Sequence, residues 1–189
     1  MANKDSKQQL RKELLKRRSE LNNTEYNKKS GRIVKTLKNQ PEFDKATVIH
    51  CYVSMNDRKE VNTHPLIKDL ILGEKRLAVP ITNFKDVTLS HKYLEKFEDL
   101  QENKWGVLEP KFGKQADLED FELVIVPMVG GDYDKNRIGY GKGFYDRFLQ
   151  QVKCPTIGLL FDRCLIEEIP VEPFDIALDK CITENNVIV

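Results

Sequence analysis

The chain has few cysteines and arranges none of them for metal binding or redox exchange. Among its 189 residues there are four, Cys51, Cys154, Cys164 and Cys181. No two are spaced as CxxC, and no cysteine–histidine cluster has the spacing of a zinc site. We therefore expect reduced thiols that are mostly buried.

Long apolar runs are also missing. No run approaches the roughly 18 residues that a membrane-spanning helix needs. The first residues, MANKDSKQQLRKELLKRR, have no apolar core like that of a secretory signal. A composition of 40% hydrophobic and 32% charged residues is typical of a soluble globular protein. We expect a cytoplasmic protein without membrane contact, folded as one α/β domain over 1–189.

Charge is almost balanced overall but unevenly distributed. The net charge is +1, yet residues 1–38 carry 12 Lys or Arg against 4 Asp or Glu, and the remainder carries 19 against 26. This asymmetry favours an anionic partner near the N-terminal segment, such as a nucleotide, a polyglutamate or a nucleic acid. The alternative is a solvated helix face.

The N-terminal segment has the pattern of two helices. Ser6 and Gln9 have the spacing of a capping box, Thr24 can cap a second helix, and Pro41 ends it. Leucines near one face of the first helix leave its basic residues on the remaining surface. The sequence thus predicts a basic helical hairpin over residues 6–39.

Strands and helices alternate in the rest of the chain. Apolar runs predict strands at 46–53, 76–80, 122–127, 156–161 and 186–189, and period-two alternation predicts an edge strand at 87–93. Short helices are expected at 65–72 and 142–152, whereas 94–120 is polar and irregular apart from WGVLEP at 105–110. The alternation predicts a mainly parallel sheet, in which ligands bind beyond the carboxyl ends of the strands.

Residues 136–148, NRIGYGKGFYDRF, form a glycine-rich segment between a strand and a helix. Its three glycines would let the backbone approach an anion closely, and Arg137 and Lys142 supply positive charge. The segment lacks the Ser or Thr after the lysine of a Walker A loop, and it lacks the GxGxxG spacing of a dinucleotide site. A tight turn that packs a helix on a sheet explains the glycines equally well.

Asp146 is the second clue within this segment. A carboxylate beside a phosphate repels it unless a cation lies between them, so the combination indicates phosphate together with Mg²⁺. The alternative is an acid that stabilises the first turn of a helix. His50, His64 and His91 show no catalytic partner pattern, and we interpret each as structural or surface-exposed.

Six stretches in order resemble the 5-formyltetrahydrofolate cyclo-ligase family over nearly the whole chain. They are KQQLRKEL, SMNDRKEVNT, KRLAVP, WGVLEP, GYGKGFYDRFL after LVIVP, and IPVEPFDIALDKCIT. The resemblance implies a three-layer α/β/α fold like that of sugar-phosphate isomerases and coenzyme A transferases. It also implies ATP- and Mg²⁺-dependent closure of 5-formyltetrahydrofolate to 5,10-methenyltetrahydrofolate, with release of ADP and phosphate.

The resemblance assigns roles to particular positions. The expected ATP contacts are Lys7, Arg11, Arg137, Ile138, Gly139, Tyr140, Gly141, Lys142, Gly143, Phe144 and Tyr145. The expected folate contacts are Val53, Met55, Glu60, Trp105, Glu109, Pro110, Tyr140, Gly141, Lys142, Gly143 and Phe144. Lys142, Arg137 and Tyr145 are the expected catalytic residues, and Asp146 and Asp179 the expected metal ligands.

The chain departs from the family pattern at two places. Phe144 replaces a tyrosine that the family usually has, and the segment before Arg137 reads PMVGGDYDKNR, with its glycines moved. We expect a monomer that binds ATP and 5-formyltetrahydrofolate, which can carry a polyglutamate tail, and binds no nucleic acid. The rival hypotheses are an RNA-binding protein that uses the basic helices and another enzyme on the same fold, such as a sugar-phosphate isomerase.

Overall fold

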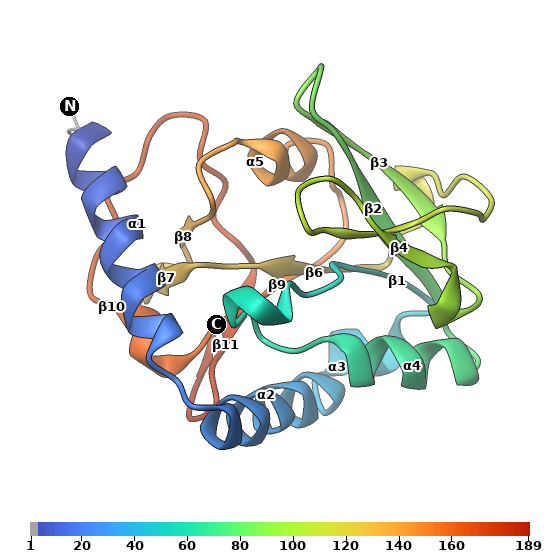
Figure 1. Ribbon diagram of the computed structural model, residues 1–189, viewed down its shortest axis with the longest axis horizontal. Coiled ribbons are helices and arrows are strands. Elements are labelled where there is room, and N and C mark those ends of the chain that lie inside the picture. Colours follow the sequence, from blue (N-terminus) through green and yellow to red (C-terminus); the bar gives the residue numbers. More distant parts are fainter. Residues whose placement is uncertain (1–3) are drawn as a thin grey trace.

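A seven-stranded sheet forms the centre of the protein (Figure 1). The structure, a computed structural model, describes residues 4–189. Its strands are β1 (Val48–Cys51), β2 (Arg76–Asn83), β3 (Thr88–Tyr93), β6 (Leu123–Pro127), β9 (Thr156–Leu159), β11 (Lys180–Ile182) and β12 (Val187–Ile188). They lie in the order β12-β11-β9-β6-β1-β2-β3. The five inner strands are mutually parallel and both edge strands are antiparallel, which confirms the predicted mainly parallel sheet.

Five α-helices among residues 4–189 accompany the sheet. They are α1 (Lys4–Ser19), α2 (Asn23–Lys38), α3 (Pro41–Lys45), α4 (His64–Leu72) and α5 (Phe144–Leu149). Asn22 caps α2 in a reciprocal capping box with Glu25, so the predicted cap at Thr24 is wrong by two residues. α1 begins at Lys4, which places Ser6 inside the helix rather than at its start. α5 is shorter than the predicted helix over 142–152.

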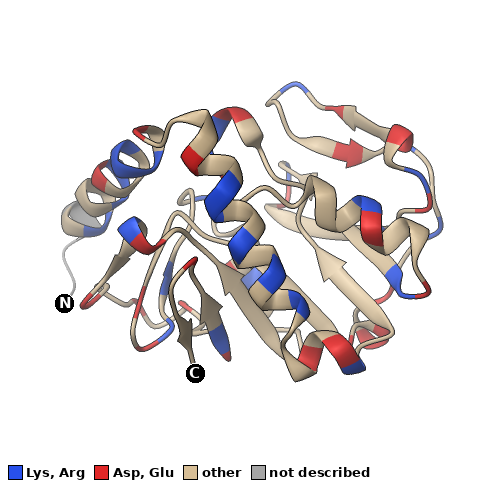
Figure 2. Ribbon diagram, turned by 90° about the horizontal axis from the view of Figure 1, so that it is seen from below, with Lys and Arg blue, Asp and Glu red and all other residues tan. Residues whose placement is uncertain are grey.

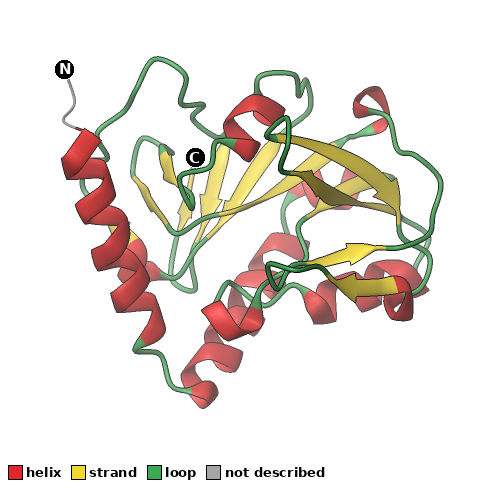
Figure 3. Ribbon diagram, turned by 45° about the horizontal axis from the view of Figure 1, so that its top comes forward, coloured by secondary structure: helices red, strands yellow, loops and turns green. Residues whose placement is uncertain are grey.

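The two N-terminal helices exist, but they do not lie side by side as a hairpin. α1 and α2 diverge from the short turn between them, and they cover different parts of the molecule (Figures 1 and 3). α1 packs on the segment around Cys164, whereas α2 packs near β11. Figure 2 shows basic positions spaced along α2. In this helix Lys28, Arg32 and Lys35 are exposed.

Alternate residues of the inner strands bury their side chains on opposite faces of the sheet. Ile49 and Ile125 pack with α2, α3 and α4, whereas Val124 and Val126 pack with Phe148 of α5. β1 is buried at every position, as its continuous apolar run predicted. The result is helices on both faces of a sheet, and the likeness to sugar-phosphate isomerases and coenzyme A transferases stays a prediction.

A smaller sheet lies under α1. Its strands are β7 (Gly130–Asp132), β8 (Arg137–Ile138) and β10 (Leu165–Ile166), in the order β10-β7-β8. Leu14 of α1 packs with Ile138 and Cys164 in a separate apolar cluster. A hairpin of β4 (Leu100–Glu102) and β5 (Leu108–Pro110) crosses the region that was predicted to be irregular. These strands are too short to produce a periodic sequence pattern.

The cysteine thiols are reduced, and two histidines are buried in the core. All four cysteines are free, and three of them are buried. His50 and His91 are buried against each other, with 3.1 Å between His50 Nε2 and His91 Nδ1. Burial lowers the pKa of both imidazoles, and that of His91 falls to about 4. Within residues 4–189, no helix combines the length and the apolar character needed to cross a bilayer.

Two leucines of α4 offer a matched test of this core. Leu70 is 5% exposed and Leu72 is 87% exposed. We predict that Leu70→Ala lowers the free energy of unfolding by about 2–5 kcal/mol because it leaves a cavity in the core. Leu72→Ala should change it by less than about 0.5 kcal/mol. Urea unfolding monitored by circular dichroism measures both, and equal effects would contradict the packing described here.

Candidate active site

The glycine-rich segment lies beyond the carboxyl end of β6, where ligands of parallel sheets usually bind. β8 leads into it, and α5 begins directly after Gly143, which has a φ of 75°. Gly139 and Tyr140 are half-buried, whereas Gly141 and Lys142 are exposed. The structure thus presents the backbone and the lysine of this segment to solvent at the expected edge of the sheet.

Arg11 of α1 lies against this segment. Its Nε donates a hydrogen bond to the carbonyl oxygen of Gly139 at 2.7 Å. Gly141 has a φ of 84°, and a Cβ at that position would lie 2.9 Å from Arg11 Cζ. Glycine at 141 is therefore favoured by the backbone conformation, and a side chain there would displace the Arg11 guanidinium.

Lys7 also lies on α1, one helical turn before Arg11. It is 8% exposed and forms ion pairs with Asp175 and, at 3.5 Å, with Glu172. Both acids belong to the segment between β10 and β11. The predicted nucleotide-binding lysine is therefore brought to the site together with two carboxylates that sequence analysis did not select.

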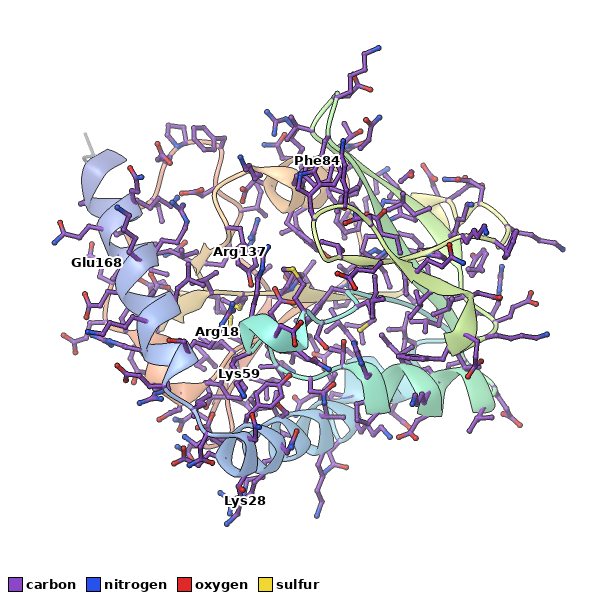
Figure 4. The ribbon with its side chains drawn as sticks, viewed as in Figure 1. Arg18, Lys28, Lys59, Phe84, Arg137 and Glu168 are labelled. Atoms are coloured by element: carbon purple, nitrogen blue, oxygen red, sulfur yellow. The ribbon has the colours of Figure 1, made fainter. Side chains whose placement is uncertain are left out.

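Arg137 is buried at the base of the glycine-rich segment (Figure 4). One of its terminal nitrogens, Nη2, binds Asp146 Oδ1 at 2.6 Å. Burial lowers the pKa of Arg137, and the charge of Asp146 is the largest effect that opposes this shift. Smaller opposing effects come from Tyr145 and Asp175. Arg137 therefore has Asp146 and Asp175 as acidic neighbours.

Two buried polar atoms beside this ion pair have no hydrogen-bond partner among the described residues. They are Arg137 Nε and the hydroxyl oxygen of Tyr145. A buried donor without a partner costs about 1–3 kcal/mol, so such groups are usually explained by a ligand, a water or a function. Burial raises the pKa of Tyr145, which keeps its hydroxyl protonated and able to donate.

The predicted folate side lies across from the glycine-rich segment. Glu60 is 3% exposed, and its Oε2 accepts a hydrogen bond from the backbone N–H of Met55 at 2.7 Å. Val53 is buried nearby in the core, just past the end of β1. Burial raises the pKa of Glu60, and Arg18 has the largest opposing effect. The structure thus brings Glu60, Met55 and Tyr140 to one place.

The β4–β5 hairpin adds an aromatic group to the same region. Trp105 is 41% exposed and stacks on Phe84, with 3.5 Å between ring centroids. Phe84, labelled in Figure 4, in turn meets Phe144 edge-to-face, with 5.3 Å between the ring centroids. The Phe144 ring thus joins an aromatic contact, an environment that does not require the hydroxyl of the usual tyrosine.

Arg58 connects this hairpin to the glycine-rich segment. Its Nη2 lies 3.5 Å from the Trp105 carbonyl oxygen, and its Cζ lies 5.6 Å from the ring centroid of Tyr140. Glu109 and Pro110 have a different surrounding: Oε1 of Glu109 accepts hydrogen bonds from the N–H and hydroxyl of Thr82, and Pro110 is buried. These two residues hold the hairpin on β2.

The structure does not bring the two predicted metal ligands together. Asp179 precedes β11, at the amino-terminal edge of the sheet, whereas the glycine-rich segment follows the carboxyl edge. Its Oδ2 accepts hydrogen bonds from the N–H and the hydroxyl of Thr156, both at 2.8 Å. Asp179 therefore fixes the start of β9 and does not lie beside Asp146, so its predicted role as a metal ligand gains no support from this position.

Asp175, unlike Asp179, lies near Arg137 and therefore on the same side of the sheet as Asp146. It binds Lys7, and its charge, like that of Asp146, acts on Arg137. The described residues contain no group of three or more histidines, cysteines or acids arranged to hold a metal by themselves. Mg²⁺ commonly uses only one or two protein carboxylates together with phosphate oxygens, so Asp146 and Asp175 fit such an ion.

Sequence analysis did not select five residues that the structure brings to this site. They are Arg18, Arg58, Phe84, Glu172 and Asp175. Arg18 stands within a run of basic residues, and the signal that could have singled it out is its spacing: it follows the buried Leu14 by four residues on the same face of α1. Phe84 lies in a turn between β2 and β3. Asp175 stands four residues before Asp179 in a segment without periodicity. Local sequence therefore does not show which of the two acids faces the glycine-rich segment.

These features define an α/β enzyme whose basic, glycine-rich site lies at the carboxyl edge of a parallel sheet. A model of the 5-formyltetrahydrofolate cyclo-ligase family matches residues 3–184. The chain belongs to that family of ligases, which confirms the resemblance noted in its motifs.

Individual relatives agree with this assignment. The chain is 28% identical to the 5-formyltetrahydrofolate cyclo-ligase of Mus musculus, over 96% of this chain and 95% of the relative. The solved 5,10-methenyltetrahydrofolate synthetase of Aquifex aeolicus is 31% identical with a TM-score of 0.85, covering 96% of this chain and 91% of that one. The synthetase of Mycoplasma pneumoniae, 22% identical with a TM-score of 0.76 over 94% and 98%, shows the same fold.

The corrected role of Asp179 is testable through stability. We predict that Asp179→Ala lowers the free energy of unfolding by about 1–3 kcal/mol, because two donors of Thr156 lose their acceptor. Thermal or urea unfolding measures the change. Exposed Asp86→Ala is the control, although it also loses one exposed contact with Asn83, and a loss for Asp179→Ala no larger than in this control would contradict the structural role.

Proposed function

We propose that the protein catalyses the ATP- and Mg²⁺-dependent cyclisation of 5-formyltetrahydrofolate to 5,10-methenyltetrahydrofolate, releasing ADP and phosphate. The observation that carries this proposal is the convergence of α1, the glycine-rich segment and the Glu60 region on one site. Lys7 and Arg11 lie on one side of it, Arg137 and Asp146 at its base, and Glu60 opposite.

The chemistry requires activation of an unreactive group. The formyl group on nitrogen is an amide, whose carbon is a weak electrophile and whose oxygen leaves poorly. Transfer of the γ-phosphoryl group to the formyl oxygen converts that oxygen into phosphate. The neighbouring anilinic nitrogen then attacks the formyl carbon and forms the new C–N bond. The bond between that carbon and the phosphorylated oxygen breaks, and phosphate leaves. No protein nucleophile is needed, which agrees with a site built from charges and hydrogen-bond donors.

The roles of the residues follow from their positions. Lys142, exposed on the glycine-rich segment, is suited to stabilise the γ-phosphoryl group during transfer. Arg137 and the Tyr145 hydroxyl offer the buried donors that have no protein partner. Backbone N–H groups from Ile138 to Gly143 add further donors to phosphate oxygens.

The nucleotide would displace part of the existing charge pairing. Lys7 now pairs with Asp175 and Glu172, and Arg11 binds the Gly139 carbonyl, so both cations are already held close to the segment. Asp146 and Asp175 would hold Mg²⁺. When bound, this ion neutralises charge on the nucleotide phosphates.

The folate would lie between Glu60 and the aromatic group. The Glu60 carboxylate can accept hydrogen bonds from the donor edge of the pterin, with Val53 and Met55 beside it. The ring faces of Trp105 and Phe144 would border the rest of the substrate. The proposal includes a monomeric, cytoplasmic enzyme that accepts polyglutamylated folate, as the basic N-terminal segment favours.

The activity has a direct assay. Protein, 5-formyltetrahydrofolate, ATP and Mg²⁺ are mixed, and the near-ultraviolet absorption band of the methenyl product is followed. We expect an ATP-dependent rise, reduced by about 10²-fold or more in Lys142→Met because a transition-state charge partner is removed. Lys114→Met, which removes an exposed lysine elsewhere, should retain full activity. Absence of the rise in the unmodified protein refutes the function.

The magnesium ligands are tested by titration of Mg²⁺ at saturating substrates. We expect Asp146→Asn and Asp175→Asn each to raise the half-saturating Mg²⁺ concentration by about tenfold or more, since even outer-shell partners of a metal have effects of that size. Asp179→Asn is the matched control, because it lies at the other edge of the sheet. If Asp179→Asn raised the concentration and Asp175→Asn did not, the corrected assignment would be wrong.

A further inference from the structure

Arg18 is the largest side chain that is fully buried in the described part of the protein, at 2% exposure. It lies near the end of α1, on the side of the helix that faces the rest of the protein (Figure 4). Arginine is almost never fully buried unless its charge is paired and its donors are satisfied. Its neighbour Arg17 shows the ordinary case, a side chain that is 41% exposed and paired with Glu13 at the surface.

The guanidinium of Arg18 connects three segments of the chain. Its Nη1 donates to the carbonyl oxygen of Met128, directly after β6, at 3.2 Å. Its Nη2 donates to the Tyr140 hydroxyl oxygen in the glycine-rich segment at 2.6 Å. No carboxylate within 4 Å pairs with Arg18 in the described residues, although the group is buried; its compensating charge is at longer range.

The negative charge that compensates Arg18 is the carboxylate of Glu60. The Tyr140 hydroxyl, which accepts from Arg18, lies close to Glu60: burial and then the Glu60 charge raise the pKa of Tyr140. Arg58, from the same loop as Glu60, lies 5.6 Å from the Tyr140 ring centroid. Glu60 is 3% exposed and accepts a hydrogen bond from the Met55 N–H. Arg18, Tyr140 and Glu60 thus form one buried cluster, in which the hydroxyl that binds the cation is also next to the anion.

We propose that Arg18 is a positioning residue that keeps the Glu60 carboxyl negatively charged and, through the Tyr140 hydroxyl, directs it at the substrate. The inference rests on the proposed function, because it assigns Glu60 the recognition of donor groups on the folate. A carboxylate offers acceptors only, whereas a protonated carboxyl turns one oxygen into a donor and loses that recognition.

The direction of the pH effect follows from the surroundings of Glu60. The charged or titratable groups that face it are Arg18 from α1, Tyr26 from α2, Tyr52 after β1, Arg58 from the turn Asn56–Arg58, Tyr140, and Tyr145 from α5. Burial raises the pKa of Glu60, and Arg18 opposes this more than any other group does. Without Arg18 the pKa rises further, so protonation occurs at higher pH.

The experiment compares kcat/KM for 5-formyltetrahydrofolate between pH 5 and pH 9 in Arg18→Met, Arg18→Lys, Tyr140→Phe and Glu60→Gln. We expect the acid limb of the profile to move to higher pH by about one unit in Arg18→Met, which is about a tenfold loss below the limb. In Arg18→Lys the acid limb should lie close to its position in the unmodified protein. In Tyr140→Phe the limb should move to higher pH, as in Arg18→Met. Glu60→Gln should abolish the limb. In Arg18→Met, KM for ATP at high pH should change little.

Arg17→Met is the matched control, because it removes the same charge from the adjacent, solvated position. Its profile should coincide with that of the unmodified protein. The proposal is overturned if Glu60→Gln abolishes the acid limb and Arg18→Met leaves the limb at its original pH. Should Arg18→Met fail to fold by circular dichroism, Tyr140→Phe decides: an unshifted limb in that variant has the same meaning.

A second readout does not depend on catalysis. The Glu60 carboxyl is titrated by ¹³C NMR in the folded protein, its resonance identified by its loss in Glu60→Gln. A higher midpoint in Arg18→Met than in the unmodified protein and Arg17→Met supports the role of Arg18, and equal midpoints overturn it. If the unmodified protein is inactive but the midpoints differ, the proposed function fails while the pairing of Arg18 with Glu60 stands.

Discussion

The packing of α1 against the segment that follows β6 is the contact on which the rest of the site depends. Leu14 provides the apolar part of this contact, since it packs with Val129 and Ile138. Around it, Arg11 and Arg18 donate hydrogen bonds to that segment. Apolar burial stabilises this packing, whereas burial of the cations costs free energy that their partners must offset.

The site accordingly holds its charges in compensated pairs. Arg137 faces Asp146, Lys7 faces Asp175, and Arg18 binds the Tyr140 hydroxyl, which lies close to Glu60. Each pairing offsets part of the cost of burying its charges, and it also holds them in position before a ligand arrives. Some buried donors still have no partner among the described residues, including Nε of Arg18, Nε of Arg137 and the Tyr145 hydroxyl.

The two predicted metal ligands differ in how far local sequence could predict their positions. Asp146 follows the glycines within a few positions, so its nearness to the loop was predictable from local sequence. Asp179 and Asp175 stand in one irregular segment, and either could face the loop until the register of β11 is known. Pairing of Lys180 with Ile157 places Asp179 beside Thr156, at the far edge of the sheet.

The alternation of strands and helices, the parallel sheet and the glycine-rich segment with its charges were predictable from the amino-acid sequence, because these arise from local periodicity and residue type. The family motifs, which lie in order along the chain, were visible there too. Three facts emerged from the folded structure alone: α1 leaves α2 to cover a small second sheet, Asp175 rather than Asp179 lies near Arg137, and Arg18 is buried beside Tyr140. Those facts depend on contacts between residues more than 100 positions apart, which no local pattern encodes.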